Sequence, residues 1–298
     1  MTENINPLKK IYHEISSQKL QYINAKDIVF DFDELFITPE KRGSTFFLDY
    51  YSPDGIEYAF NKYGIFETLN KKGFNNIKLE VQTKDIYRQR LALYFDNIDI
   101  EHLLCEIILR RKVINLNENL SSFTKNKSFD MLVIEWLYSQ NPKETFSPER
   151  PRLPEQKYPG LKTGKLILDL LLITCERLGL NGLINIPSHF HNAQIYSVRF
   201  SYISPECEGK RKAIERDLLE KYSLATVSWA IMLGCVYENN EPFNWFISEQ
   251  ATPLDKNLKK YFEEQKYKNI LEETFHKNKY FLNEELFKEK KLFIDNLK

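Results

Sequence analysis

Several stretches in the first half of the chain have hydrophobic patterns that predict strands. Residues 76–81 alternate cleanly, and residues 90–95 are rich in aromatic and aliphatic side chains. Residues 131–138 are almost continuously apolar, as expected for a central strand that is covered on both faces. Residues 28–30 and 44–51 also favour strands, because aromatic and branched residues are frequent in them. The pattern therefore predicts a sheet in this half.

A period of 3.6 residues marks the helices that are expected beside these strands. Residues 7–24 form an amphipathic pattern, and residues 55–72 repeat it up to Gly73, which is placed to end the helix. Residues 165–178 carry apolar side chains around nearly the whole circumference, so this helix should be buried against a sheet. Residues 102–114 have a long apolar centre that fits either a helix or a strand.

The composition after Pro205 shifts toward Lys and Glu with helical periodicity. Helices are predicted over residues 208–222 and 223–233, with Ser223 as the N-cap of the second. A helical tail is predicted over residues 254–297, and the aromatic stretch 244–247 favours one more strand between the helices. The last third is therefore expected to be mainly helical.

Five prolines interrupt the chain between residues 141 and 159, where they remove backbone donors and favour extended geometry. This stretch is predicted to be a long loop, and residues 183–186 beyond the helix at 165–178 are predicted to be a short strand. Strands and helices thus alternate through the middle of the chain, which indicates a mixed α/β fold.

Charge and cysteine content narrow the functional classes. The 42 basic residues balance the 42 acidic residues, which argues against a dedicated nucleic-acid partner. The four cysteines are scattered without a C-x-x-C pair, so neither a zinc ribbon nor a disulfide framework is indicated. No stretch has the length of a membrane span and the start lacks the apolar core of a signal peptide, so a cytoplasmic protein without a membrane partner is expected.

One segment has the pattern of a ligand site. It is the run from Pro159 to Lys165, whose two glycines stand immediately before a predicted helix. Free backbone N–H groups and the positive end of the helix dipole attract phosphate at such a position. The run is not a Walker A loop, because it has one residue too few between Gly160 and Gly164, and Leu166 stands where Ser or Thr is required. An acyl-CoA or a nucleotide would suit it.

The order of strand, glycine-containing loop, helix, glycine-containing turn, strand and short helix with a tyrosine resembles the core of the GCN5-related N-acetyltransferase (GNAT) superfamily. In that family a Gln/Arg-x-x-Gly-x-Gly/Ala loop wraps the pyrophosphate of acetyl-CoA, and an Asn…Ala…Tyr…Gly-Phe segment packs beside the thioester. The stretch from Gln156 to Gly164 and the run from His191 to Phe200 resemble these parts, within a direct match over roughly residues 129–203.

The resemblance implies a fold, a domain division and a function. The fold is a GNAT-like mixed, partly splayed sheet flanked by helices, in a domain over residues 25–205 with a Pro-rich insertion at 139–159. An N-terminal helix (1–24) precedes it and a mainly helical C-terminal region (206–298) follows it. The implied activity is N-acyl transfer from acetyl-CoA, or another acyl-CoA, to an unidentified amine, either a small molecule or a peptide.

The resemblance also implies site residues. Tyr196 is expected to be the general acid, and Glu135, on an apolar strand where burial would raise its pKa, the general base. Cofactor contacts are expected from Gln156, Gly160, Leu161, Lys162, Thr163, Gly164, Lys165 and Asn192.

Alternatives remain open at this point. Lys162 and Arg199 stand where the family pattern has glycine, and this departure motivates a second hypothesis, a catalytically inactive GNAT-like fold that binds a ligand or a protein. Asp31 and Asp33 resemble the opening Asp-x-Asp of haloacid-dehalogenase-type phosphatases, but a convincing later acidic pair is missing. The run from His189 to His191 spaces two imidazoles as a metal site would, yet no third ligand supports it, so no metal is expected.

Overall fold

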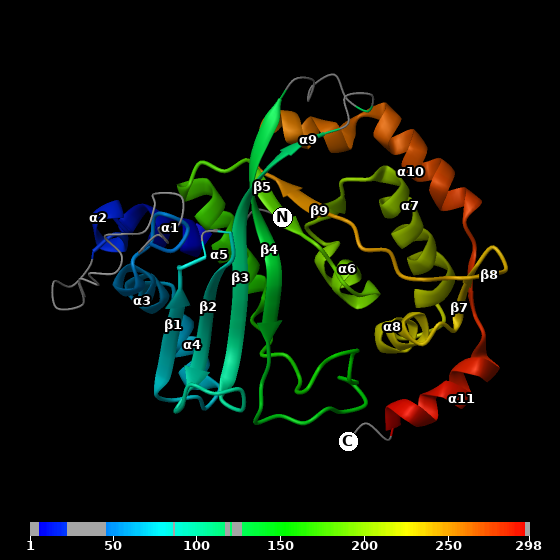
Figure 1. The fold of residues 1–298 in the computed structure, drawn as a ribbon, viewed down its shortest axis with the longest axis horizontal. Coiled ribbons are helices and arrows are strands. Elements are labelled where there is room, and N and C mark those ends of the chain that lie inside the picture. The colour runs from blue at the N-terminus through cyan, green and yellow to red at the C-terminus, as the bar shows by residue number, and fades with distance from the viewer. Residues whose placement is uncertain (1–5, 23–45, 86, 117–119, 121–126, 296–298) are drawn as a thin grey trace. The chain divides into compact units, whose positions relative to one another are not determined.

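The chain has a mixed α/β fold, as a computed structural model shows (Figure 1). The structure describes residues 6–22, 46–85, 87–116, 120 and 127–295. The chain divides into two compact units, each made of several chain segments. Unit 1 comprises residues 1–112, 131–144 and 160–180, and unit 2 comprises residues 113–130, 145–159 and 181–298. The expected strand at 28–30 and the Asp31/Asp33 pair lie outside the described residues.

Four strands that are neighbours in sequence order give unit 1 its sheet. They are β1 (Ile77–Gln82), β2 (Gln89–Phe95), β3 (Leu103–Asn115) and β4 (Ser128–Ser139), of which the ends of β3 and β4 extend into unit 2. β1 pairs antiparallel with β2, so that Leu79 lies opposite Leu93, and β2 pairs antiparallel with β3. The strands expected over 76–81, 90–95 and 131–138 are confirmed, and the ambiguous stretch 102–114 is a strand.

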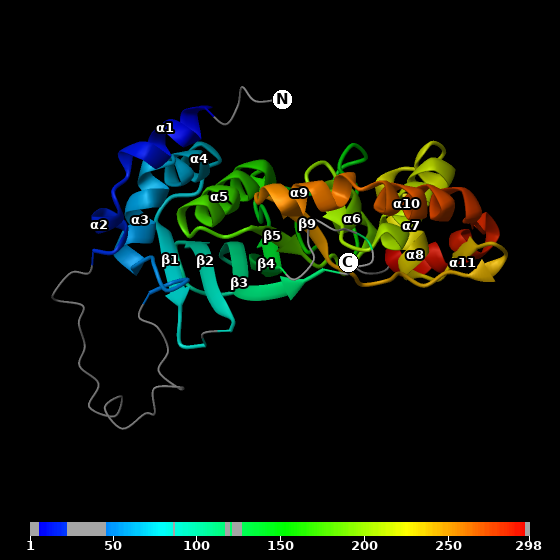
Figure 2. The same ribbon diagram turned by 90° about the horizontal axis from the view of Figure 1, so that it is seen from above.

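Helices cover one face of these strands, as Figure 2 shows for α3, α4 and α5. The helices of unit 1 are α1 (Asn6–Glu14), α2 (Ser17–Leu20), α3 (Pro53–Lys62), α4 (Ile65–Lys71) and α5 (Gly164–Arg177). Ser52 caps α3 by accepting a hydrogen bond from the Gly55 amide. The side chains between the helices and the sheet include the buried residues Leu69, Phe74, Leu93 and Leu104.

Two expected helices are each interrupted. The helix expected over 7–24 breaks between α1 and α2 at Ser16. The helix expected over 55–72 breaks at Gly64, whose φ of 71° ends α3 and starts α4 in a new direction. Gly73, with a φ of 84°, ends α4 as predicted.

The strand expected over 44–51 is not observed in the described part, residues 46–51. These residues form a turn closed by a single bridge between Phe47 and Tyr51, with Leu48 and Asp49 in the left-handed region. Phe47, Leu48 and Tyr51 are buried. Their apolar side chains therefore serve the core from a turn, which β propensity cannot distinguish from a strand because it measures fit to a half-buried surface.

Unit 2 contains a second set of paired strands. β9 (Gln250–Pro253) lies between β5 (Gly182–Asn185) and β6 (Ser201–Tyr202) and is antiparallel to both. A small sheet has the order β10-β7-β8, from β7 (Val236–Glu238), β8 (Glu241–Pro242) and β10 (Tyr280–Leu282). The short strand expected at 183–186 is thus confirmed.

The rest of unit 2 is largely helical. Its helices are α6 (Phe190–Tyr196), α7 (Pro205–Ile214), which continues into a π-helical turn (Glu215–Leu219), α8 (Leu224–Met232), α9 (Lys256–Glu263), α10 (Gln265–Lys277) and α11 (Glu284–Asp295). Ser223 caps α8 as predicted, by accepting from the Thr226 amide. None of the helices among the described residues combines the length and the apolar character needed to cross a membrane.

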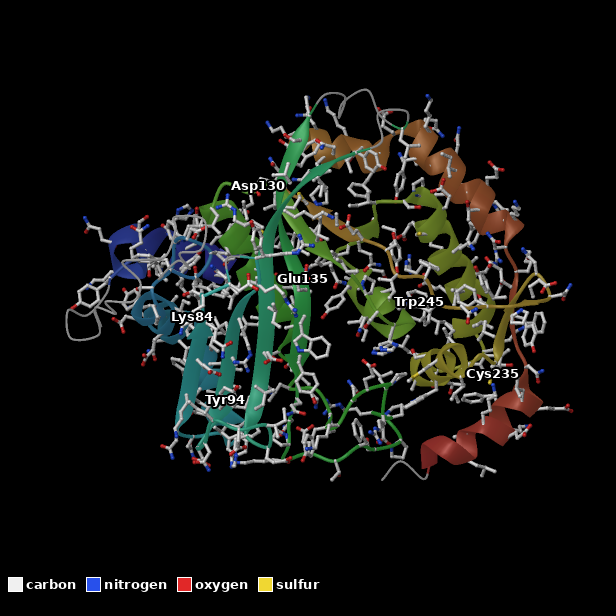
Figure 3. The ribbon with its side chains drawn as sticks, in the orientation of Figure 1. Lys84, Tyr94, Asp130, Glu135, Cys235 and Trp245 are labelled. Atoms are coloured by element: carbon white, nitrogen blue, oxygen red, sulfur yellow. The ribbon has the colours of Figure 1, made fainter. Side chains whose placement is uncertain are left out.

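The strand expected over 244–247 is wrong. Trp245 stacks on Phe246, contacts Phe190 edge to face and donates its indole N–H to the Pro187 carbonyl at 3.2 Å. In Figure 3 the Trp245 side chain lies beside α6. The aromatic side chains of this segment thus pack into the helical core of unit 2 instead of pairing in a sheet.

Candidate functional site

The loop before α5 contains most of the expected cofactor contacts. Leu161 is buried in the core of unit 1, so only its main chain is available to a ligand. Lys162 is exposed and has a φ of 60°, in the left-handed region that favours glycine. The hydroxyls of Thr163 and Ser139 are 3.2 Å apart and tie this loop to the end of β4.

The first turn of α5 leaves its amides available. The first hydrogen bond inside the helix runs from the Ile167 amide to the Thr163 carbonyl at 3.0 Å. The Thr163 side chain does not cap the helix, and within the described ranges no acceptor is placed on the amides of Gly164, Lys165 and Leu166. Amides of this kind attract anions, because their partial positive charges are not satisfied inside the helix.

Steric access to this turn is open. A methyl group added at Gly164 would meet no atom within 4 Å, and one added at Gly160 would lie 3.6 Å from the Ser139 carbonyl oxygen. Gly164 and Lys165 are exposed, as is Lys162. Neither lysine has an acidic partner in the part of the chain that the structure describes. The loop thus combines open amides with two unneutralised cations.

Glu135 lies on β4 of unit 1, where Figure 3 labels it. Its carboxylate accepts a hydrogen bond from Nε of Arg110 on β3, and the two form an ion pair. The side chains are 25% and 27% exposed, respectively. The expected environment, a carboxyl group surrounded by apolar residues, is therefore wrong. Arg110 is 25 positions from Glu135 in sequence, and the strand pattern alone did not indicate that the two side chains would meet.

The remaining expected site residues belong to unit 2. The Gln156 side chain accepts a hydrogen bond from the Leu153 amide at 3.1 Å and closes a turn of the Pro-rich loop. Asn192 and Tyr196 are four residues apart on α6, which places them on one helix face. Tyr196 is half-buried and contacts Phe200 edge to face at 5.9 Å. Glu135 and the loop at 160–165 belong to unit 1, so the expected residues are divided between the two units.

The histidine pair of unit 2 has an unusual environment. The His189 and His191 rings stack at 5.3 Å, and His189 Nε2 lies 3.0 Å from a Glu155 carboxylate oxygen. Burial, together with the neighbouring His189, lowers the pKa of His191 to about 4. Nδ1 of His191 is buried and has no hydrogen-bond partner among the described residues. No group of three or more His, Cys, Asp or Glu side chains that could hold a metal occurs in the same ranges.

One feature of unit 1 was not anticipated from the sequence. It is an apolar cavity between the helices and the sheet, with Arg177 and Tyr63 in its wall. Leu161 and Thr163 of the expected cofactor loop also line it. The continuously apolar pattern of α5 was the available signal, but that pattern predicts burial without distinguishing a filled core from a hollow one.

Comparisons of this chain with models of protein families, with curated proteins and with solved structures gave no match.

Proposed function

We propose that this protein is an acyl-CoA-dependent N-acyltransferase that acts on an amine. The observation that carries the proposal is the start of α5, where the amides of Gly164, Lys165 and Leu166 have no acceptor among the described residues and Lys162 and Lys165 are exposed beside them. Such a cationic turn suits the diphosphate of an acyl-CoA. The order of β4, the loop, α5, β5 and α6 along the chain also agrees with the family resemblance.

Roles for the side chains follow from the chemistry of acyl transfer, for which the acyl-CoA supplies an activated acyl group. Lys162, Lys165 and the α5 amides hold the diphosphate, while Gln156 and Asn192 contribute polar contacts. Tyr196 donates a proton to the departing thiolate, and Glu135 accepts the proton of the amine through water. Glu135 can fill this role only where its ion pair with Arg110 is exchanged for the water.

Binding tests the proposal most directly. Acetyl-CoA should raise the melting temperature of the full chain in a saturable manner, because a ligand that binds only the folded state stabilises it by mass action. The double variant Lys162→Ala/Lys165→Ala should weaken this binding about a hundredfold or more, since hydrogen bonds to charged groups are each worth about 1.5–3 kcal/mol. The matched control is Lys62→Ala/Lys71→Ala, which removes the same charge from exposed positions on α3 and α4.

No stabilisation by acetyl-CoA at millimolar concentration would remove the proposal. Equal weakening by both double variants would show that binding depends on total charge and not on the α5 loop.

Turnover separates catalysis from binding. Tyr196→Phe should lower kcat by about a hundredfold or more with a reactive amine, since a general acid typically contributes that much, and should leave acetyl-CoA affinity nearly unchanged. Tyr237→Phe, a half-buried tyrosine on β7 that stacks on Phe281, is the matched control. Unaltered turnover in Tyr196→Phe would exclude the acid role.

The second candidate function is a non-catalytic module that binds a ligand or a protein. The observation that favours it is the ion pair between Arg110 and Glu135, which occupies the carboxylate that the first proposal needs as a base. It predicts acetyl-CoA binding without transfer to any amine of a broad panel, and binding that is unchanged in Glu135→Gln.

A further inference from the structure

Unit 1 contains an apolar cavity of about 150 Å³. Its walls come from β2, β3 and helices α2, α3, α4 and α5, together with Ile15 and the turn at residues 46–51. Leucine and isoleucine side chains form most of the surface, among them Leu91, Leu109, Ile167 and Leu171. Protein interiors are normally packed without voids of this size, so the space is a departure from ordinary core packing.

A small group of polar side chains interrupts the apolar wall. Arg177, at the end of α5, is half-buried and donates Nη2 to the Tyr12 carbonyl at 2.7 Å and Nη1 to the Ile15 carbonyl at 3.1 Å. Its guanidinium also stacks over the Tyr12 ring and hydrogen-bonds the Tyr63 side chain. These contacts fix the cation in the cavity wall.

Tyrosine hydroxyls add further polar atoms to the same wall. The Tyr51 hydroxyl shares a hydrogen bond with the Thr174 side chain, one helical turn before Arg177. Burial raises the pKa of both Tyr51 and Tyr63, so the two phenols stay neutral near pH 7. The described part of the cavity wall therefore has one permanent positive charge and two neutral phenol groups, beside the hydroxyls of Thr68, Thr163 and Thr174.

Arg177 has no carboxylate partner among the residues that the structure describes. The adjacent Glu176 instead pairs with Lys9 at 3.4 Å, and its side chain is 34% exposed. A guanidinium has five N–H donors in a planar fork that matches a carboxylate, and its bonds to two carbonyls and one phenol leave donors for an anion. A guanidinium in an apolar wall, with no carboxylate partner among the described residues, is a binding element for an anionic amphiphile.

We propose that this cavity binds a linear aliphatic monocarboxylate, with its chain against the leucines and isoleucines and its carboxylate on Arg177. The chain length follows from the volume, because cavities of about 150 Å³ accommodate a hydrocarbon of about six carbons such as benzene. Hexanoate is therefore the expected ligand size. Leu161 and Thr163 of the loop before α5 also line the cavity, but the carboxylate contact is at Arg177, at the other end of α5, and does not rest on acyl transfer.

Calorimetric titration of the full chain tests the charge requirement with three ligands of equal chain length. Hexanoate should bind saturably, 1-hexanol should bind more weakly, and hexylamine should not bind, because its ammonium group would face Arg177. Equal binding of hexanoate and 1-hexanol would overturn the carboxylate contact.

Variants locate the site. Arg177→Gln should weaken hexanoate binding by about tenfold to a hundredfold and leave 1-hexanol binding unchanged, since only the charged hydrogen bonds are lost. Lys9→Gln, which removes a half-exposed cation from α1, is the charge-matched control and should bind hexanoate normally. Ala59→Leu adds three carbons to the cavity wall and should block both ligands.

The fold is checked through the melting temperature of each unliganded variant. If Arg177→Gln lowers the melting temperature, Arg177→Lys replaces it as the test. This variant keeps the charge and should retain part of the hexanoate affinity. Lys162→Ala/Lys165→Ala should bind hexanoate as the unmodified protein does, which separates this site from the acyl-CoA proposal. Unchanged hexanoate binding in either Arg177→Gln or Ala59→Leu would overturn the proposal.

Discussion

The two units place an arginine in their cores in different ways. In unit 1, Arg177 lies in the wall of an apolar cavity and contacts carbonyls and a phenol. In unit 2, Arg211 is ion-paired to Glu208, and each side chain is 5% exposed. A buried pair neutralises its charge internally, whereas a cation without a carboxylate depends on dipoles or on a ligand. The difference agrees with the proposed recognition role of Arg177 and with a structural role for Arg211.

The environment of Arg211 supports this distinction. Its guanidinium donates to Gln194 at 2.7 Å and to Glu215 at 2.9 Å, in addition to Glu208 at 2.6 Å. The other Glu208 oxygen accepts from the Tyr202 amide at 3.0 Å. Helices α6 and α7 and strand β6 are thus joined by one network in which the charged atoms are satisfied.

Replacing each arginine should change the free energy of unfolding most, and the size of the change should differ between the two units. Arg211→Met leaves the Glu208 carboxylate buried without a countercharge, so the free energy of unfolding should fall by about 3–5 kcal/mol. Arg177→Met leaves no buried carboxylate and loses only hydrogen bonds to neutral groups, so the loss should stay below about 3 kcal/mol. Urea unfolding at neutral pH measures both values.

Glu215→Gln is the control for Arg211, since this partner is 47% exposed and its loss should cost less than about 1 kcal/mol. Equal losses for the two arginine variants would contradict the distinction between the units.

Acid should act on unit 2 through His191. Its folded-state pKa of about 4 lies below the ordinary value near 6.5, so the native state binds fewer protons than the unfolded state between these pH values. Stability contributed by the neutral imidazole is complete above pH 6.5 and is lost as the pH falls toward 4, by up to about 3 kcal/mol. The free energy of unfolding, measured between pH 7 and 4, should show this decline.

His191→Gln removes the titrating group, and its unfolding free energy should depend less steeply on pH over the same range. An identical slope in the variant would assign the acid sensitivity to other groups, such as His189, which stacks on His191, and its partner Glu155.

Two glycines at close contacts of helices, one in each unit, should give smaller losses of stability when they are replaced. An added methyl group at Gly55 on α3 would lie 2.0 Å from the Leu20 carbonyl oxygen, and one at Gly209 on α7 would lie 2.6 Å from the Leu271 carbonyl oxygen. Gly55→Ala and Gly209→Ala should each lower stability by about 1–3 kcal/mol, because backbone must move to admit the methyl group. Thermal unfolding of the two variants measures the losses.

The cavity gives unit 1 free volume nearby, so Gly55→Ala should be the milder of the two if the helices can shift into it. A larger loss in Gly55→Ala would show that the cavity walls are rigid.

Replacing the glycine that follows a helix should cost the least stability, and the cost should be the same in both units. Gly73 and Gly234 follow α4 and α8 with φ values of 84° and 65°, and an added methyl group would meet no atom within 4 Å at either position. Gly73→Ala and Gly234→Ala should each cost about 1 kcal/mol from backbone conformation alone. Gly164→Ala, at an open position whose φ is not positive, should be nearly neutral to stability. A marked difference between Gly73→Ala and Gly234→Ala would mean that packing contributes at one of them.

Local pattern was sufficient for most elements of the fold. The alternating strand β1, the aromatic and aliphatic strand β2, the apolar run of β4, the Ser223 cap and the stop at Gly73 were predicted correctly, because each depends on neighbours within a few residues. The segments 46–51 and 244–247 were wrong as strands. Phe47 and Tyr51 are buried, and Trp245 and Phe246 are partly buried against the core of unit 2, but burial and strand pairing are separate properties.

The candidate site was predicted in part. The open amides at the start of α5 follow from a glycine-containing loop before an apolar helix, and the sequence indicates both. The ion pair of Glu135 was not predicted, because its partner Arg110 comes from a neighbouring strand. Contacts between residues far apart in sequence depend on strand neighbours and packing, which a single sequence pattern does not specify.

The amino-acid sequence by itself determined the mixed α/β class, most of the helices and strands, and a glycine-containing loop before α5, because these depend on periodicity and on local backbone chemistry. The tertiary structure alone decided that Arg211 is neutralised by a buried glutamate, that Glu135 is ion-paired and that Arg177 lies in the wall of an apolar cavity. The physical reason is that the charge state and accessibility of a side chain depend on its neighbours in space, and for cavities on how completely distant segments fill the volume between them.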